Sequence, residues 1–336
     1  MIHSSVNLKS LNSFGVEVVT NQFGTFKNIE ELRALLKEKG DSELLILGGG
    51  SNLLFTKNFN GLVIKNEIKG IDIVQEDDNR IIVKAGAGEN WHEFVLKCIE
   101  NNWGGIENLS LIPGNVGASP MQNIGAYGVE IKDVFHELEA FHIESGTIKL
   151  FKHQECNFGY RESVFKNTMK GQYIILNVSF ELTKKNHQIK TSYGDILNEL
   201  KRNEISLPTI KDVSNAIIAI RKSKLPDPKE LGNAGSFFKN PVIEKSEFEN
   251  LQKKHPKIPH YVINENQVKV PAGWLIEQAG WKGKKFNNFG VHNKQALVLV
   301  NYGGASGIEI YNLSTEILND IQNKFNIKLE REVNII

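Results

Sequence analysis

Residues 112–128 are the feature that most limits how this chain can fold. They read I-P-G-N-V-G-A-S-P-M-Q-N-I-G-A-Y-G, with four glycines, two prolines and no charged side chain. Glycine and proline interrupt helices and strands, and a loop this long is usually functional or disordered. Disorder requires a polar, charged composition. The apolar and aromatic residues Val116, Ile124 and Tyr127 therefore argue against disorder here. We therefore expect an ordered loop whose bare backbone amides can approach a large, flat ligand.

Two further glycine turns have the chemistry of a phosphate cradle, because unpaired backbone N–H groups attract anions. They are G-G-G-S-N at 48–52 and G-A-G at 86–88. A dinucleotide fingerprint needs G-x-G-x-x-G before a helix, but Leu53 stands where the third glycine belongs, and no G-K-S or G-K-T occurs. A glycine turn after a strand is often only structural. For the long loop, an uncharged aromatic cofactor with a pyrophosphate tail is favoured over a structural role.

Amphipathic helices and strands alternate along the chain, which predicts a mixed α and β class with a strand-rich middle. Helices are expected after the caps Asn28, Asn90 and Ser306, over 212–221, and from Pro271 to Gly280. Strands are expected at 44–47, 61–65 and 80–85, repeatedly within 134–182, and over 328–336. The polar segment 184–188 is a candidate domain boundary.

Composition excludes several classes of protein. A chain of 336 residues has room for two or three domains, and its formal charge of +1 argues against a nucleic-acid or membrane-surface partner. No apolar run long enough for a membrane span and no signal peptide is visible, so a cytoplasmic protein is expected. Cys98 and Cys156 read as free thiols. The nine histidines show no metal-ligand spacing, so we expect no metal.

Eight segments in order resemble the UDP-N-acetylenolpyruvoylglucosamine reductase family, and the resemblance covers the chain from about residue 4 to its C-terminus. Besides 112–128, they are G-G-G-S-N-L-L-F (48–55), F-G-Y-R-E-S-V-F-K (158–166), S-Y-G-D (192–195), L-P-D-P-K (225–229), G-N-A-G-S-F-F-K-N-P (232–241), A-G-W-L-I-E (272–277) and L-E-R-E-V (329–333). The S-Y-G-D segment indicates the subtype with an additional tyrosine loop over the substrate (type I).

The resemblance implies an α+β fold with a two-lobed FAD-binding domain of the vanillyl-alcohol-oxidase (PCMH) type. This domain is expected over 15–186, with lobes of about 15–67 and 68–186. A substrate-binding α+β domain is expected over 205–328, and a strand at 329–336 is expected to return to the flavin cleft. The implied activity is NADPH-dependent reduction of UDP-N-acetyl-3-O-(1-carboxyvinyl)-glucosamine to UDP-N-acetylmuramate, through non-covalent FAD, by a monomeric protein in peptidoglycan precursor synthesis.

The family motifs carry binding roles onto two sets of residues. FAD is expected along uncharged positions: Gly48, Gly49, Gly50, Ser51, Asn52, Pro113, Gly114, Gly117, Ala118, Ser119, Asn123, Gly125, Ala126, Tyr127 and Gly128. The nucleotide sugar is expected to contact Tyr127, Tyr193, Lys224, Asn240 and Gln295.

Three residues match the family's catalytic positions. Ser236 would deliver a proton, Arg161 would hold the substrate carboxylate through paired hydrogen bonds, and Glu332 would polarise the substrate. Without the motifs, Ser236 reads as a surface serine and Arg161 as a strand-end arginine in an ion pair. Glu332 lies on the strand face opposite Leu329 and Val333, so periodicity alone predicts a solvated residue. A catalytic Glu332 therefore requires that face to look into the flavin cleft.

Two other functions compete with the reductase. An FAD-dependent oxidase of the same fold, acting on another small molecule, would share the glycine loops, but G-S-F-F-K-N-P and L-E-R-E-V favour the reductase. A nucleotide-sugar-binding or scaffold protein without chemistry would not need the intact Ser236, Arg161 and Glu332.

Overall fold

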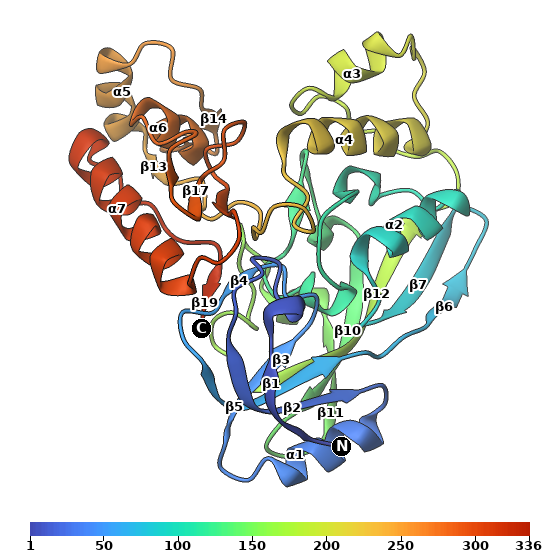
Figure 1. Cartoon of the computed structure of the whole chain (residues 1–336). Coiled ribbons are helices and arrows are strands. Elements are labelled where there is room, and N and C mark those ends of the chain that lie inside the picture. The colour runs from blue at the N-terminus through green and yellow to red at the C-terminus, as the bar shows by residue number, and fades with distance from the viewer. The chain divides into compact units, whose positions relative to one another are not determined.

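The computed structural model describes residues 1–336, and the chain divides into two compact units. Unit 1 contains residues 1–6, 20–49 and 60–223, and unit 2 contains residues 7–19, 50–59 and 224–336. Figure 1 labels the helices and strands of both units. The ranges 15–186 and 205–328 stay predictions.

Unit 1 contains an antiparallel sheet of five strands in the order β11-β10-β12-β7-β6. The strands are β6 (Ile71–Glu76), β7 (Arg80–Gly86), β10 (Phe135–His142), β11 (Ile148–Lys152) and β12 (Tyr173–Thr183). The helix α2 (Trp91–Glu100) lies against this sheet (Figure 1), and its Trp91 and Phe94 contact Phe180 of β12. The predicted strand-rich middle and the helix after Asn90 are confirmed.

A second sheet has the order β1-β2-β5-β3. Its strands are β1 (His3–Asn7), β2 (Val19–Phe26), β3 (Glu43–Leu47) and β5 (Phe59–Asn66). In unit 1, helix α1 (Ile29–Glu38) buries Leu32 and Leu35 against this sheet. The predicted cap is present, because the Asn28 side chain accepts the N–H of Glu31 at 2.8 Å.

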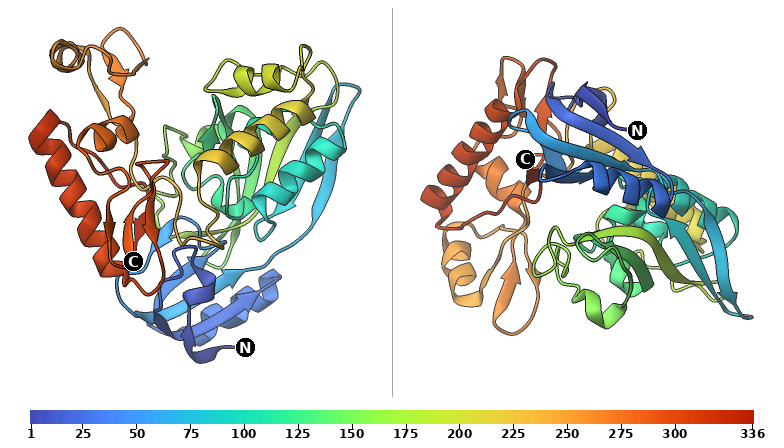
Figure 2. Two further views of the ribbon diagram at one scale, coloured as in Figure 1. Left: turned by 45° about the horizontal axis from the view of Figure 1, so that its top comes forward. Right: turned by 90° about the horizontal axis from the view of Figure 1, so that it is seen from below.

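Helices α3 (Ile196–Arg202) and α4 (Ile210–Lys224) pack against each other at the end of unit 1, as Figure 2 shows. Their contact buries Ile196, Leu200, Val213 and Ile217. Helix α4 ends before Pro226, as predicted, because proline cannot continue a helix.

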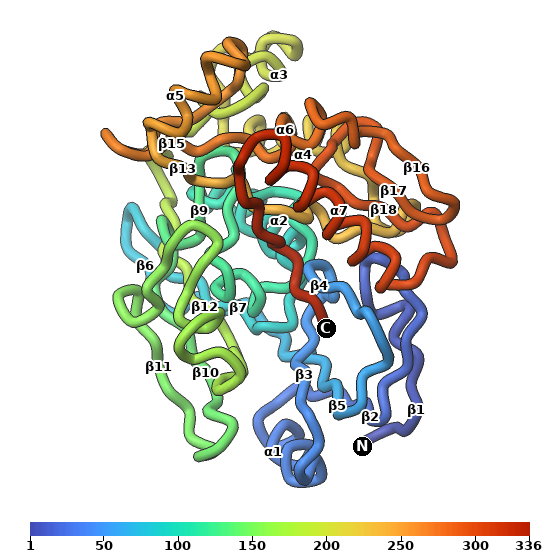
Figure 3. Tube along the Cα trace, turned by 90° about the vertical axis from the view of Figure 1, so that its left-hand side faces the viewer, coloured from blue at the N-terminus to red at the C-terminus, as the bar shows by residue number.

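Unit 2 combines helices with short strands. The helices are α5 (Lys245–Lys254), α6 (Ala272–Gln278) and α7 (Gly307–Phe325), and the strands are β13 (Val242–Glu244), β14 (Tyr261–Val262), β15 (Gln267–Lys269), β16 (Lys285–Phe286), β17 (Phe289–Val291) and β18 (Leu299–Asn301). Helix α7 lies beside β17 and β18 (Figure 3). It begins with the predicted capping box of Ser306 and Glu309.

The predicted strand at 328–336 is too long. Only β19 (Asn334–Ile335) forms a ladder, parallel to β4 (Leu53–Leu54), and an isolated bridge joins Arg331 to Phe238. The segment changes partner halfway, which breaks the ladder: Glu332 N donates to Phe237 O, whereas Asn334 N donates to Asn52 O.

Candidate functional site: the glycine loop and the Ser236 segment

The uncharged stretch is ordered, as predicted, because it is hydrogen-bonded to the turn that precedes α2. We use the name glycine loop for residues 111–128. In this loop Val116 N donates to Glu89 O and Gly117 N to Ala87 O, both at 2.9 Å. In return, Trp91 N donates to Gly114 O at 3.0 Å. Two of the three glycine turns identified in the sequence therefore meet in unit 1.

The third turn approaches the same loop through residues without side chains. A Cβ on Gly49 would lie 2.8 Å from the Cα of Gly114. The approach of the 86–88 turn is equally close, because a Cβ on Gly117 would lie 2.5 Å from the Cβ of Ala87. Such distances leave no room for a side chain. Gly49, Pro113 and Gly128 are exposed, so uncharged backbone is accessible at three points of these two turns. Accessible backbone N–H groups of this kind can bind the pyrophosphate of a cofactor.

We expect Gly49→Ala to separate the two turns, whereas Gly48→Ala should not. A Cβ on Gly48 would lie 3.8 Å from the Cβ of Asn115, which is an ordinary contact. In protein stripped of cofactor, Gly49→Ala should lower the free energy of unfolding by about 1–3 kcal/mol, and Gly48→Ala should leave it nearly unchanged. Urea denaturation measures both, and equal stability of the two variants would contradict the close approach.

Backbone strain concentrates at this loop. Leu111, Asn123 and Tyr127 have positive φ angles of 58°, 44° and 50°, and the nearby Arg161 has 57°. Each non-glycine residue in this region costs on the order of 1–3 kcal/mol and persists only where neighbours hold it, most often at functional sites. Asn123 is fully buried and donates to Glu130 Oε2 and to Gly159 O, both at 3.0 Å.

Arg161 lies against the end of the glycine loop. Its Nη2 donates to the carbonyl of Gly125 at 2.8 Å, in the hairpin of β8 (Gly125–Ala126) and β9 (Val129–Glu130). The rings of Tyr127 and Tyr193 meet edge to face with centroids 6.4 Å apart. The structure therefore brings three residues predicted to meet the substrate to one end of this loop.

The start of the glycine loop depends on a neutral histidine. His92 Nδ1 lies 3.0 Å from the backbone N–H of Leu111 and accepts its proton, which a protonated imidazole could not do. Burial, with the positive charges of Arg221 and Lys222, lowers the pKa of His92, while Glu93 opposes that shift.

We therefore expect acid to weaken the fold through His92. A lowered pKa means that the unfolded chain binds this proton more readily, so the contribution is fully present above the ordinary value of about 6.5 and is lost as pH falls through the folded pKa. Urea denaturation at about pH 7.5 and about pH 5.5 should show a smaller loss of stability for His92→Gln than for the parent. Equal losses would contradict the assignment.

Ser236 and Glu332 lie on neighbouring segments of unit 2. Ser236 bridges to Val298 on one side, and Phe237 O accepts the N–H of Glu332 at 2.8 Å on the other. Asn52 Nδ2 lies 3.5 Å from the carbonyl of Glu332. Glu332 is half-buried, and is therefore less exposed than the solvated position that periodicity alone predicts.

The remaining predicted substrate residues of unit 2 occupy two places. Asn240 Oδ1 accepts the N–H of Ala272 at 2.9 Å, and a Cβ on Gly273 would lie 3.1 Å from Gln295 Oε1. Asn240 and Gln295 therefore both lie at the start of α6. Lys224 is exposed at the end of α4.

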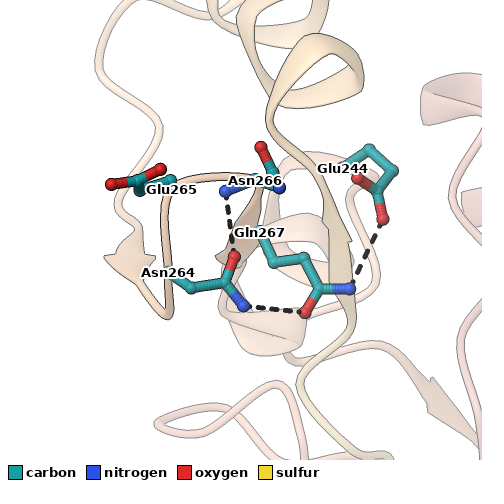
Figure 4. A pocket seen from close by; sticks show the side chains of 5 residues that line it. All are labelled: Glu244, Asn264, Glu265, Asn266 and Gln267. Carbon is teal, nitrogen blue, oxygen red and sulfur yellow. Dashed lines mark hydrogen bonds between the residues drawn. The ribbon is translucent and has the colours of Figure 1, made fainter.

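The predicted site residues thus form two groups. Unit 1 holds Gly48, Gly49, the residues of the glycine loop, Arg161 and Tyr193, and unit 2 holds Gly50, Ser51, Asn52, Lys224, Ser236, Asn240, Gln295 and Glu332. A separate hollow in unit 2 is lined by Glu244, Asn264, Glu265, Asn266 and Gln267 (Figure 4). Its polar side chains bond to one another, and it contains none of the predicted residues.

Sequence reasoning missed His92 and Arg221, which both contact the glycine loop. Arg221 Nε donates to the carbonyl of Leu111 at 3.2 Å. For Arg221 the sequence contained a usable signal, which is its position one turn after Ile217 on the apolar face of α4. Charged residues are rarely found on such a face unless a partner satisfies them.

Comparisons with known proteins give the class of this protein. The model of an FAD-binding domain family matches residues 22–151, and the model of the UDP-N-acetylenolpyruvoylglucosamine reductase C-terminal domain matches residues 227–336. The solved p-cresol methylhydroxylase shares the fold, with a TM-score of 0.50 and 11% identity over 96% of this chain and 83% of its own. The molecule is an FAD-dependent flavoprotein of the PCMH fold.

Full-length relatives give the family. The UDP-N-acetylenolpyruvoylglucosamine reductase of Flavobacterium johnsoniae is 58% identical over 100% of this chain and 99% of its own. That of Bacteroides fragilis is 45% identical over 98% of each. The solved reductase of Thermus caldophilus has a TM-score of 0.69 at 22% identity, over 100% of this chain and 99% of its own. The chain belongs to the UDP-N-acetylenolpyruvoylglucosamine reductase family.

Proposed function

We propose that the protein reduces the enolpyruvyl ether of UDP-N-acetylglucosamine to the lactyl ether, UDP-N-acetylmuramate, with NADPH as the electron source. The net reaction adds a hydride to the vinyl CH₂ carbon and a proton to the carbon that bears the ether oxygen and the carboxylate. Bound FAD supplies the hydride relay between NADPH and the sugar. The glycine loop and the Gly48-Gly49 turn would hold it, because they present uncharged backbone without side chains.

Ser236 is proposed to deliver the proton. A hydroxyl is a weak acid near neutral pH, but it can protonate the strongly basic carbon that hydride addition creates. The neighbouring Glu332 would polarise the substrate beside that serine. The observation that carries the proposal is the backbone hydrogen bond between the Ser236 and Glu332 segments, Glu332 N to Phe237 O at 2.8 Å.

Arg161 is proposed to hold the substrate carboxylate. A guanidinium can donate two parallel hydrogen bonds to a carboxylate and favours the negative charge that spreads onto it during reduction. The bond from Arg161 Nη2 to Gly125 O orients the guanidinium at the loop. Tyr127, Tyr193, Lys224, Asn240 and Gln295 are proposed to bind the diphosphate and the sugar.

The decisive experiment follows flavin absorbance without oxygen. NADPH should bleach the yellow protein, and the enolpyruvyl nucleotide sugar should restore the colour with one equivalent of UDP-N-acetylmuramate formed. Bleaching without recovery by the sugar would overturn the proposal in favour of an oxidase of the same fold. Protein that binds no flavin would overturn both.

We further propose that the protein acts as a monomer in the cytoplasm, without nucleic acid. The formal charge of +1 gives no electrostatic attraction for a polyanion. None of the helices combines the length and the apolar composition that crossing a membrane requires. Light scattering on the FAD-loaded protein would test the monomer, for which 37.8 kDa plus the cofactor is expected.

A further inference from the structure

Arg221 of α4 bonds to both ends of the glycine loop. Its Nε donates to the carbonyl of Leu111 at 3.2 Å, and its guanidinium is hydrogen-bonded to the side chain of Tyr127. Leu111 and Tyr127 are sixteen positions apart in the sequence, and the residues between them include most of the predicted FAD contacts. One side chain thus connects the beginning and the end of the surface that would carry the cofactor.

An ion pair does not account for this arginine. Burial lowers the pKa of Arg221, and the groups that act on it are Tyr127, which opposes the shift, and Arg161, which adds to it. Neither is a carboxylate, and a half-buried cation beside a second cation is unfavourable. The guanidinium offers five donors in a rigid fork, which suits it to join two acceptors.

Both residues that Arg221 holds are in the strained left-handed region. Leu111 has φ 58° and Tyr127 has φ 50°, and an unheld residue of either kind would relax to negative φ. Leu111 is held by side chains on both sides, because His92 accepts its N–H and Arg221 donates to its carbonyl. The carbonyl of Tyr127 accepts a hydrogen bond from Asn108 Nδ2 at 2.9 Å, which holds the backbone of this residue. Its phenol is held separately, by the hydrogen bond with Arg221.

We propose that Arg221 is a positioning residue that fixes both ends of the glycine loop, so that the loop is shaped for FAD before the cofactor binds and the Tyr127 phenol is held for the substrate. The part that concerns FAD rests on the fold and the family. The part that concerns the substrate rests on the proposed function.

A pair of serines in the contact between α4 and the loop provides a control for the Arg221 variant. Ser214 on the same helix bonds to Ser110, beside the loop, with their hydroxyl oxygens 2.8 Å apart and both residues buried. Ser214→Ala removes a buried bond between the same helix and the same segment without touching Leu111 or Tyr127. It therefore reports what general loosening of α4 would do.

The test uses full-length protein, reloaded with FAD for turnover assays, and compares Arg221→Lys with Ser214→Ala. Lysine keeps the charge but places it on one nitrogen, which cannot hold both acceptors in the same geometry. Flavin fluorescence quenching should show FAD affinity falling about tenfold in Arg221→Lys and less than about twofold in Ser214→Ala. Thermal unfolding of the cofactor-free variants shows whether either change simply unfolds the chain. Equal FAD affinity in the two variants would overturn the proposal.

A mutant cycle tests the substrate part. Arg221→Lys and Tyr127→Phe should each raise the KM for the nucleotide sugar by about fivefold to tenfold, and the double variant should be no worse than either one. Independent, multiplying effects would overturn the link through Tyr127. If the parent protein fails to turn over the sugar at all, the proposed function fails, while the FAD titration still decides the first part.

Discussion

Ser236→Ala should lose turnover of the nucleotide sugar and keep flavin reduction by NADPH. The alanine removes the proposed proton donor, and general acid catalysis contributes about 10²–10⁴-fold to a rate. We expect the recovery of flavin absorbance on adding sugar to slow by that factor, because the serine serves only the second half-reaction. Rapid mixing of each half-reaction separately measures this difference.

Two further variants test the proton-donor role of Ser236. Ser236→Cys should retain part of the second half-reaction, because a thiol with an ordinary pKa of about 8.5 is a far stronger acid than an alcohol. Ser246→Ala changes an exposed serine of α5 in the same unit and should behave like the parent. If Ser236→Ala slowed flavin reduction by NADPH as much as reoxidation by the sugar, the proton-donor role would be wrong.

Arg161→Lys should lower kcat/KM for the nucleotide sugar by about a hundredfold. Lysine keeps the positive charge but loses the fork that binds a carboxylate with two parallel bonds, and a hydrogen bond to a charged group is worth about 1.5–3 kcal/mol. A tenfold change in rate corresponds to about 1.4 kcal/mol. Loss of one hydrogen bond to the substrate carboxylate is therefore enough to account for the expected decrease in kcat/KM. Steady-state kinetics at saturating NADPH measure it.

The competing explanation for Arg161 is structural, since its Nη2 also bonds to the carbonyl of Gly125. FAD titration separates the two: a catalytic arginine predicts FAD affinity within about threefold of the parent, whereas a purely structural one predicts that FAD affinity and sugar turnover fall together. Arg202→Lys is the matched control, because Arg202 is exposed and pairs only with Glu199 one helical turn away.

Local chemistry made much of the fold predictable. Asn28 and the pair Ser306 and Glu309 stood where helices begin, because a side-chain oxygen must satisfy an N–H that the first turn leaves unpaired. The ends of α4 and α6 followed from the proline and glycine beside them. The length of the last strand was not predictable, since alternation of side chains does not reveal a change of partner at Glu332.

The candidate site was only partly predictable from the residues. Glycines without charge pointed to an open backbone, and the close approach of Gly49 to Gly114 agrees with that. The roles of Ser236, Arg161 and Glu332 came from the family resemblance, and they stay predictions. Arg221 and His92 were not predicted as site residues, because they act through hydrogen bonds to Leu111. Leu111 is distant from both in the sequence and belongs to no motif.

The hydrogen bonds of Ile336 limit where a purification tag can be attached to the protein. Ile336 donates its N–H to Leu54, and its carbonyl accepts from both the N–H and the hydroxyl of Thr56 at 2.8 and 2.9 Å. Only four positions separate it from Glu332. A purification tag or surface-immobilisation handle attached at Ile336 could disturb these hydrogen bonds, and with them the segment that positions this glutamate. Such additions should therefore be placed away from Ile336.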